Sequence, residues 1–256
     1  PKDIDSWLLA RALDNQTRWI NAMESVSLRE GVMISHYEML SDWQWYRRRG
    51  GLDRETIQRF LCIWSEMLAP ATPHIAEEFW SSLGGTGLLA SNTLSDLSDL
   101  SNSDWSMILA REDYLREFID TARNLRSLAE KHSNSTLSRV VVQVASKWKS
   151  ELASDAINLA STDFDFKSQG QEYIRKLPIF ENETMRGEIF QLWMTLTTGS
   201  KKKRGRIHTW SNSQKTLLLN YLDEVEIINH NSEFLAMALD IESVSYTHLR
   251  AHETNL

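Results

Sequence analysis

A sharp corner is predicted at residues 67–80, MLAPATPHIAEEFW, where two prolines interrupt an apolar pattern of helical spacing. Pro70 disfavours the helical conformation at Ala69, so the preceding helix should end there. Thr72 is a suitable N-cap residue, and Pro73 falls at the first position of a new helix, where no backbone N–H is needed. The segment therefore predicts two antiparallel helices joined by a tight corner.

Three helices are predicted before the corner. Apolar residues recur every three or four positions over residues 4–26. Ser27 and Glu30 form an S-x-x-E capping box that should start a second helix, and Gly50–Gly51 should end it. Asp53 can cap the third helix, which leads into the corner. We therefore expect a mainly α protein that begins with an antiparallel helical bundle.

The chain changes character after the bundle. Residues 84–106 are rich in Gly, Ser, Asn and Asp, which predicts a mobile surface loop. A long helix is expected at about 107–131. The β-branched run RVVVQVAS, residues 139–146, has the length of a strand, and further helical patterns follow it. This order predicts a small α/β domain, truncated within its last strand at DIESVS, residues 240–245.

Two domains and a tail follow from these patterns. Residues 1–135 would form the helical bundle, and residues 138–243 the α/β domain. Residues 244–256 fit neither domain and resemble a translated sequencing-adaptor read-through, so we expect this tail to be non-native. His248 and His252 lie four residues apart there, but two ligands without a carboxylate or thiol make a weak site, so no metal site is expected. Because the chain begins without Met, we expect it to be a fragment.

The composition is that of an ordinary globular protein, with 41% apolar and 25% charged residues and a net charge of −7. No run approaches roughly 20 apolar residues, the length that spans a membrane. The N-terminus lacks the pattern of a signal peptide. The single cysteine, Cys62, lies in an apolar helical run and is expected to be a buried thiol. These features favour a cytoplasmic location.

The cations concentrate in two short clusters, which matters because RNA responds to the local field rather than to net charge. Guanidinium groups pair with phosphate through two N–H donors, and a base can stack on an aromatic ring beside them. The alternative is that both clusters are merely solvated. Trp43, close to the first cluster, is expected in the core. The candidate RNA-binding residues are Arg47, Arg48, Arg49, Trp45 and Tyr46 in the first cluster, and Lys201, Lys202, Lys203, Arg204 and Arg206 in the second.

No catalytic residue is expected. His74 stands at a helix start, but no Ser or Cys nucleophile with an orienting acid accompanies it, so we expect a hydrogen bond that stabilises the corner. Glu77 and Glu78 are adjacent on a helix and point about 100° apart, so they do not converge as an acid–base pair.

Three stretches carry a family resemblance. They are DIDSWLLARALDNQTRWINAMESVSLREGVMISHYEML (3–40), DWQWYRRR (42–49) and FLCIWSEMLAPATPHIAEEFW (60–80). Together they resemble the helical anticodon-binding-type domain of class I aminoacyl-tRNA synthetases. The D-x-W-x-x-A start and the L-A-P-x-x-P-H-x-A-E-E-x-W corner are typical of the isoleucyl, valyl and leucyl group. The run WYRRR before a glycine break, and RVVVQVASKWKSELA after the bundle, are similar to the archaeal and eukaryotic-type leucyl family. The resemblance covers roughly residues 3–243.

The resemblance implies the tRNA-binding C-terminal portion of a leucine–tRNA ligase, which positions tRNA(Leu) for ATP-dependent aminoacylation by a catalytic domain absent from this chain. The bundle would contact the tRNA body, and the α/β extension the long variable arm. The family's ATP-site signatures, H-I-G-H and K-M-S-K-S, are absent from the sequence, so the chain alone is expected to be inactive. Its partners would be tRNA(Leu) and the missing catalytic domain, with no membrane. The chain itself would hold no cofactor, whereas the parent enzyme would use ATP and Mg²⁺.

Two alternatives remain open. An isoleucyl- or valyl-type synthetase fragment would bind a tRNA with a short variable arm as well as one with a long arm. A non-catalytic helical interaction module, with both cationic clusters solvated, would show no tRNA affinity at low salt.

Overall fold

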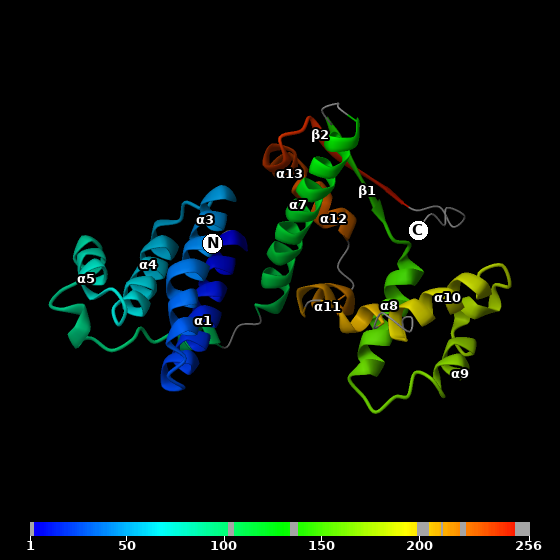
Figure 1. Ribbon diagram of the computed structural model, residues 1–256, viewed down its shortest axis with the longest axis horizontal. Coiled ribbons are helices and arrows are strands. Elements are labelled where there is room, and N and C mark those ends of the chain that lie inside the picture. Colours follow the sequence, from blue (N-terminus) through cyan, green and yellow to red (C-terminus); the bar gives the residue numbers. More distant parts are fainter. Residues whose placement is uncertain are drawn as a thin grey trace. The chain divides into compact units, whose positions relative to one another are not determined.

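Helices dominate the structure, as the sequence predicted (Figure 1). The chain divides into two units, Pro1–Leu109 and Ala110–Leu256. The computed structural model describes residues 3–101, 105–133, 138–198, 205–210, 212–220 and 224–248.

The first unit is the expected antiparallel helical bundle. The first helix contacts the third and fourth, and the fourth contacts the fifth, so that their apolar faces enclose one core. A row of rings crosses three helices of this core from Trp43 through Phe60 and Trp64 to Phe79, with successive centroids 6.1, 5.8 and 6.2 Å apart. Its elements are α1 (Asp3–Glu24), α2 (Leu28–Val32), the π-helical turn η1 (Met33–Glu38), α3 (Met39–Arg48), α4 (Arg54–Leu68), α5 (Pro73–Ser82), η2 (Leu89–Ser91) and α6 (Ser98–Ser101).

The prolyl corner forms where it was predicted. Helix α4 ends at Leu68, and α5 begins at Pro73. The capping chemistry differs, however, because the hydroxyl of Thr72 donates to the carbonyl of Leu68 at 3.2 Å instead of accepting from the start of α5. The corner is therefore closed by the end of the preceding helix. Asp53 does cap α4, accepting from the backbone N–H of Thr56 at 2.8 Å, as predicted.

The second helix that the sequence predicted forms, but a π-helical turn, η1, interrupts it between α2 and α3. Its wider turn shifts the helical phase, because i→i+5 bonding adds a residue to the turn. Leu28, Val32 and Leu40 are exposed, whereas Met39 is fully buried. The predicted capping box is also absent, since Ser27 makes no side-chain cap to α2. The indole of Trp64 donates to the carbonyl of Ser35 within the π-helical turn at 2.6 Å, which fastens η1 to α4.

The segment predicted as a mobile surface loop is anchored to the bundle over residues 84–101. The buried carboxylate of Glu66 accepts from the backbone N–H of Ser95 at 2.8 Å and from its hydroxyl at 2.7 Å. The carboxylate of Glu77 accepts from two backbone N–H groups at η2, at 2.9 and 3.1 Å. The acidic residues of α4 and α5 thus order a segment whose composition alone indicated a loop.

The second unit has the small α/β character that was expected. Strands β1 and β2 pair in parallel, from Arg139 opposite Ser243 to Val144 opposite His248, so β2 runs into the predicted non-native tail. An apolar cluster lies among α8, α9, α10 and η4. The elements are α7 (Ser106–Ser133), β1 (Arg139–Val144), α8 (Lys147–Ala160), α9 (Gly170–Arg175), η3 (Pro178–Glu181), α10 (Arg186–Thr197), η4 (Arg206–His208), α11 (Asn212–Leu219), α12 (Glu224–His230), α13 (Ser232–Leu239) and β2 (Ser243–His248).

Most of helix α7 groups with the second unit, although the sequence analysis placed it in the first domain. Arg123 donates to the carbonyl of Ala238 at 2.9 Å, and Arg126 to the carbonyls of Leu239 and Asp240 at the end of α13. The amide of Gln214 donates to Glu117 on the same helix at 2.8 Å. Cations at the C-terminal carbonyls of α13 also offset the negative end of its dipole. The boundary between the two domains that was predicted at residues 135–138 stays a prediction.

Candidate nucleic-acid interface

The first cationic cluster lies at the C-terminal end of α3. Arg47 and Arg48 are exposed, and Arg49 is half-buried at the C-cap. The chain then reverses at Gly50, whose φ of +78° favours glycine. We call Arg47, Arg48 and Arg49 the arginine corner. Cations here also offset the negative end of the α3 dipole, so the position favours them even without a ligand.

Two ring contacts hold guanidinium groups of the arginine corner. The Cζ of Arg47 lies 5.8 Å from the ring centroid of Trp43, and that of Arg48 lies 5.9 Å from the ring centroid of Trp45. Cation–π attraction at this distance contributes roughly 0.5–1 kcal/mol at exposed sites. A guanidinium group that is already restrained loses less conformational entropy when it binds phosphate.

The two rings proposed to stack on a base are both buried. Trp45 is 6% exposed and Tyr46 is 0% exposed. The phenol of Tyr46 donates to the carboxylate of Asp5 at 2.6 Å and accepts from the backbone N–H of Asp53 at 3.1 Å. Burial, and then the hydrogen bond to Asp5, raise the pKa of Tyr46. Tyr46 therefore fastens α3 to α1 and α4, and neither ring offers an open face to RNA.

The expectation that Trp45 or Tyr46 stacks on a base is therefore wrong, because both rings lie in the core. Trp43, expected in the core, stacks on the buried Phe60 and is half-buried, with Arg47 over its ring. The i, i+4 spacing of Trp43 and Arg47 was a usable signal, because such residues are neighbours on a helix surface. The helical phase after the π-helical turn decided which ring lies inside, and the sequence did not reveal that turn.

Arg54 is a further exposed cation that the sequence analysis missed. It is the first residue of α4 and follows the glycine turn after the arginine corner. A cation at a helix start opposes the positive end of the dipole, so helix stability does not favour it there. The neighbouring cap is anionic, because hydrogen bonds from Thr56 lower the pKa of Asp53. Arg54 is thus an exposed cation next to an anionic cap residue.

The second cationic cluster is described only at Arg206. Lys201, Lys202, Lys203 and Arg204 lie outside the described residues. Arg206 is exposed at the start of η4, directly after the buried Gly205. A Cβ on Gly205 would lie 2.4 Å from the carbonyl oxygen of Thr197 and 2.5 Å from that of Leu196, so only glycine fits against the end of α10. This close approach of the backbone to the end of α10 fixes the position of the neighbouring Arg206.

Other side chains offer little chemistry. Cys62, expected to be buried, is half-buried, and burial followed by the nearby charge of Glu66 raises the pKa of its thiol. In the parts of the chain that the structure describes, no group of three or more His, Cys, Asp or Glu side chains could hold a metal ion. Within the same parts, no helix is long and apolar enough to cross a membrane.

Comparisons with known proteins agree with the resemblance found in the sequence. Leucine–tRNA ligase of Methanococcus maripaludis is 26% identical over 238 residues, which cover 88% of this chain and 22% of that protein. The leucine–tRNA ligase of Pyrococcus horikoshii is 25% identical over 249 residues, covering 95% of this chain and 23% of that protein. That of Methanocaldococcus jannaschii is 25% identical over 242 residues, covering 94% and 22%. The chain thus spans less than a quarter of the length of these relatives.

A family model matches more than half of the chain, from the first turn of α1 into α8. It describes the anticodon-binding domain of tRNA ligase and covers residues 5–153. This range contains the bundle, the prolyl corner, the arginine corner and α7. The chain therefore belongs to the family of anticodon-binding domains of tRNA ligases.

Proposed function

We propose that the chain is the tRNA-binding portion of a leucine–tRNA ligase. It would position tRNA(Leu) for ATP-dependent aminoacylation that a catalytic domain absent from this chain carries out. The named relatives support the leucyl assignment. The observation that carries RNA binding is the arginine corner, where exposed guanidinium groups lie over tryptophan rings at the end of a rigid helix.

Binding would result from electrostatic attraction between the arginines and the RNA phosphates, and its effect would be to position the tRNA. Each guanidinium group that neutralises a phosphate releases counterions, which makes affinity strongly dependent on salt. A firmly held tRNA body keeps its acceptor end oriented in another domain, and such orientation lowers the barrier without chemistry at the binding surface. The bundle would hold the tRNA body, and the α/β unit would reach the long variable arm.

The parent enzyme would act in the cytoplasm and would use ATP and Mg²⁺ in its catalytic domain. Neither H-I-G-H nor K-M-S-K-S occurs in this sequence. We therefore expect the chain alone to catalyse no leucine-dependent exchange of pyrophosphate into ATP.

Filter binding of tRNA(Leu) over a range of salt concentrations tests the proposal. The chain should bind at low salt, and the double variant Arg47→Gln/Arg48→Gln should bind more weakly. Its slope of log affinity against log salt should be smaller by roughly 0.7–0.9 for each phosphate that the variant no longer neutralises. Arg29→Gln is the matched control, because Arg29 is an exposed arginine of the same unit on α2. An unchanged slope in the double variant would rule out the arginine corner as the phosphate-binding surface.

The same assay tests the second cationic cluster and the alternatives. Replacing Lys201, Lys202, Lys203 and Arg204 with Gln should also weaken binding and flatten its salt dependence. A tRNA with a short variable arm should bind more weakly than tRNA(Leu). Equal binding would favour an isoleucyl- or valyl-type fragment, and no binding at low salt would favour a non-catalytic interaction module.

A further inference from the structure

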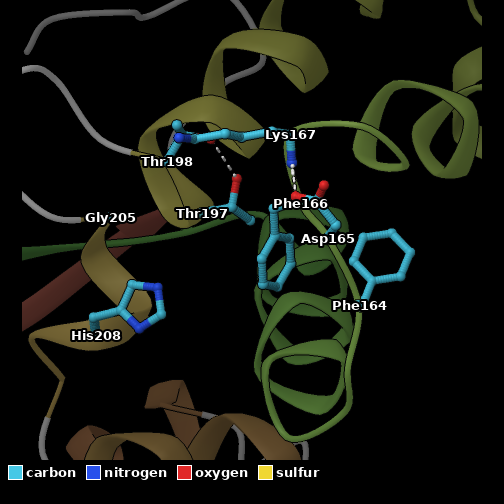
Figure 2. Close-up of a pocket in the computed structure, with 8 residues that line it drawn as sticks. All are labelled: Phe164, Asp165, Phe166, Lys167, Thr197, Thr198, Gly205 and His208. Atoms are coloured by element: carbon cyan, nitrogen blue, oxygen red, sulfur yellow. Dashed lines mark hydrogen bonds between the residues drawn. The ribbon is translucent and has the colours of Figure 1, made fainter.

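A hollow of about 570 Å³ opens on the second unit, outside the arginine corner (Figure 2). It lies between the loop that follows α8, the C-terminal end of α10 and the short helix η4. Its lining includes Phe166, Lys167, Thr198 and His208, with Asp165 and Gly205 beside them. No step of the function proposed above uses this hollow.

One wall is an aromatic ring that is held in place from behind. Phe166 is half-buried, and its ring centroid lies 5.3 Å from that of Phe164 and 5.9 Å from that of the buried Trp193. Tyr173 stacks on Trp193 at 5.4 Å and meets Phe164 edge-on at 5.8 Å. These contacts restrain Phe166 while part of its ring stays accessible from the hollow. A restrained, partly exposed ring is the feature on which nucleic-acid bases stack.

The facing wall is the exposed imidazole of His208, which points toward the hollow in Figure 2. Its position is fixed by its neighbours on η4. Ile207 is 2% exposed in the core, and Gly205 packs directly against the carbonyl groups at the end of α10. The hollow is therefore bounded by two planar rings, each carried by a packed element. A flat aromatic ligand fits between them better than an aliphatic one.

The rim carries groups suited to a sugar–phosphate. The side chain of Lys167 extends along the rim of the hollow, on the side of Thr197 and Thr198 (Figure 2). The hydroxyl of Thr197 donates to the carbonyl of Trp193 at 2.8 Å, and that of Thr198 lies 3.3 Å from the Thr197 hydroxyl and also bonds to the sulfur of Met194 at 4.0 Å. An ammonium group attracts a phosphate, and a hydroxyl can bond to a ribose or a phosphate oxygen.

Asp165 carries the only carboxylate among these lining residues. Its negative charge would repel a phosphate close by. Its two oxygens accept from the hydroxyl of Ser168 at 2.7 Å and from the backbone N–H of Lys167 at 3.0 Å. These hydrogen bonds lower the pKa of Asp165, so it stays charged. A phosphate would therefore lie toward Lys167, with the base directed between Phe166 and His208.

We propose that this hollow binds one unpaired nucleotide of an RNA, with its base between Phe166 and His208 and its phosphate at Lys167. The proposal rests on the proposed function, because it identifies which feature of the RNA the second unit holds. Base stacking tolerates all four bases, so the hollow selects an unpaired position rather than a sequence. Duplex RNA, whose bases are stacked inside, would not enter it.

The test uses the full chain and a single-stranded RNA hexamer that contains 2-aminopurine, whose fluorescence falls when its base stacks. Binding should quench this fluorescence. Phe166→Leu should weaken hexamer binding roughly 5-fold or more, within the range of about 5- to 150-fold typical of a removed stacking ring. His208→Ala and Lys167→Gln provide two further variants from separate elements. Phe180→Leu is the matched control, since Phe180 is a half-buried ring of the same unit outside the hollow.

The outcomes separate this proposal from the proposed function, with the thermal midpoint of each variant confirming folding. In one outcome, tRNA(Leu) binds, but the fluorescence of the hexamer is quenched equally by the native chain, by Phe166→Leu and by His208→Ala. The nucleotide site is then wrong and tRNA binding stands. If the hexamer is bound and quenched but tRNA(Leu) is not, the site stands and the proposed function fails. Binding of neither overturns both. A free mononucleotide that binds as tightly as the hexamer would contradict the assignment to RNA.

Discussion

Among the described residues, the core of the first unit buries more polar side chains than the core of the second. In the first unit, buried polar side chains connect helices that are distant in sequence, as when Asp42 on α3 accepts from Arg11 and Asn15 on α1 at 3.0 and 2.9 Å. In the second unit, the rings of Phe166 and Tyr173 pack against Trp193 within a largely apolar cluster. Among the described residues, the buried polar side chains are Asp5, Asn15, Gln16, Ser35, Asp42, Thr56, Ser65 and Glu66 in the first unit and Glu112, Ser154 and Thr197 in the second.

This difference indicates which property of the fold, helix register or stability, each core mainly determines. Hydrogen bonds are directional, so buried polar pairs specify the register of one helix against another. Ring contacts depend mainly on buried area and shape, so they contribute more to stability than to register. The arginine corner lies on α3, which the polar pairs align, whereas Phe166 lies on a loop that the rings support. Three substitutions test this comparison.

The largest effect is expected from Trp193→Ala in the second unit. Trp193 is 1% exposed and packs against Phe166 and Tyr173, so its removal leaves a large cavity. Substitutions of this kind cost about 3–5 kcal/mol of unfolding free energy. Urea unfolding followed by far-ultraviolet circular dichroism measures it. Trp148→Ala is the control, because Trp148 is only half-buried. An equal cost for both variants would contradict a core centred on Trp193.

A smaller effect is expected from Asp42→Ala in the first unit. The carboxylate is 1% exposed, and its removal leaves Arg11 and Asn15 without the acceptor that they share. We expect a cost of about 2–3 kcal/mol, since breaking a buried pair leaves polar groups desolvated. Asp14→Ala removes a carboxylate that is 45% exposed and lies 3.6 Å from Arg11, so it should cost less than about 1 kcal/mol. Equal costs in urea unfolding would show that the buried network does not align α1 and α3.

The smallest effect is expected from Tyr46→Phe, which removes only the hydroxyl between Asp5 and Asp53. A cost of about 1–2 kcal/mol at neutral pH follows from the two hydrogen bonds that this hydroxyl makes. Burial raises the folded-state pKa of Tyr46, so its contribution is complete below the unfolded-state pKa of about 10 and is lost as pH rises above it. The unfolding free energy of the native chain should therefore fall in alkaline buffer, and the variant should lose less over the same range. Parallel pH profiles for the two proteins would refute this role.

Local signals predicted the helical bundle well, because they act within a few residues. The break before Pro73, the cap at Asp53 and the glycine turn after the arginine corner all depend on backbone sterics and short hydrogen bonds. The match to the anticodon-binding family agrees with this prediction. The cations were also identified from sequence, since exposure of Arg47 and Arg48 follows from their charge.

The candidate site was predicted less well where it depended on packing. The burial of Tyr46 depends on Asp5 of another helix, and the π-helical turn is held where Trp64 on α4 bonds to the carbonyl of Ser35. The order of residues 84–101 followed from Glu66 and Glu77, which reach them from other elements. The pairing of Phe166 with His208 joins a loop to η4. None of these partners is close in sequence.

The sequence by itself determined the mainly helical fold, the prolyl corner, the resemblance to tRNA-ligase anticodon-binding domains and the positions of the cations, because propensity, capping and charge are properties of neighbouring residues. Only the tertiary structure decided which aromatic rings are buried, which acidic residues anchor the glycine- and serine-rich segment, and where a hollow forms. Those outcomes depend on the helical phase after η1 and on contacts between elements far apart in the chain. The physical reason is that burial is decided by packing rather than by residue type.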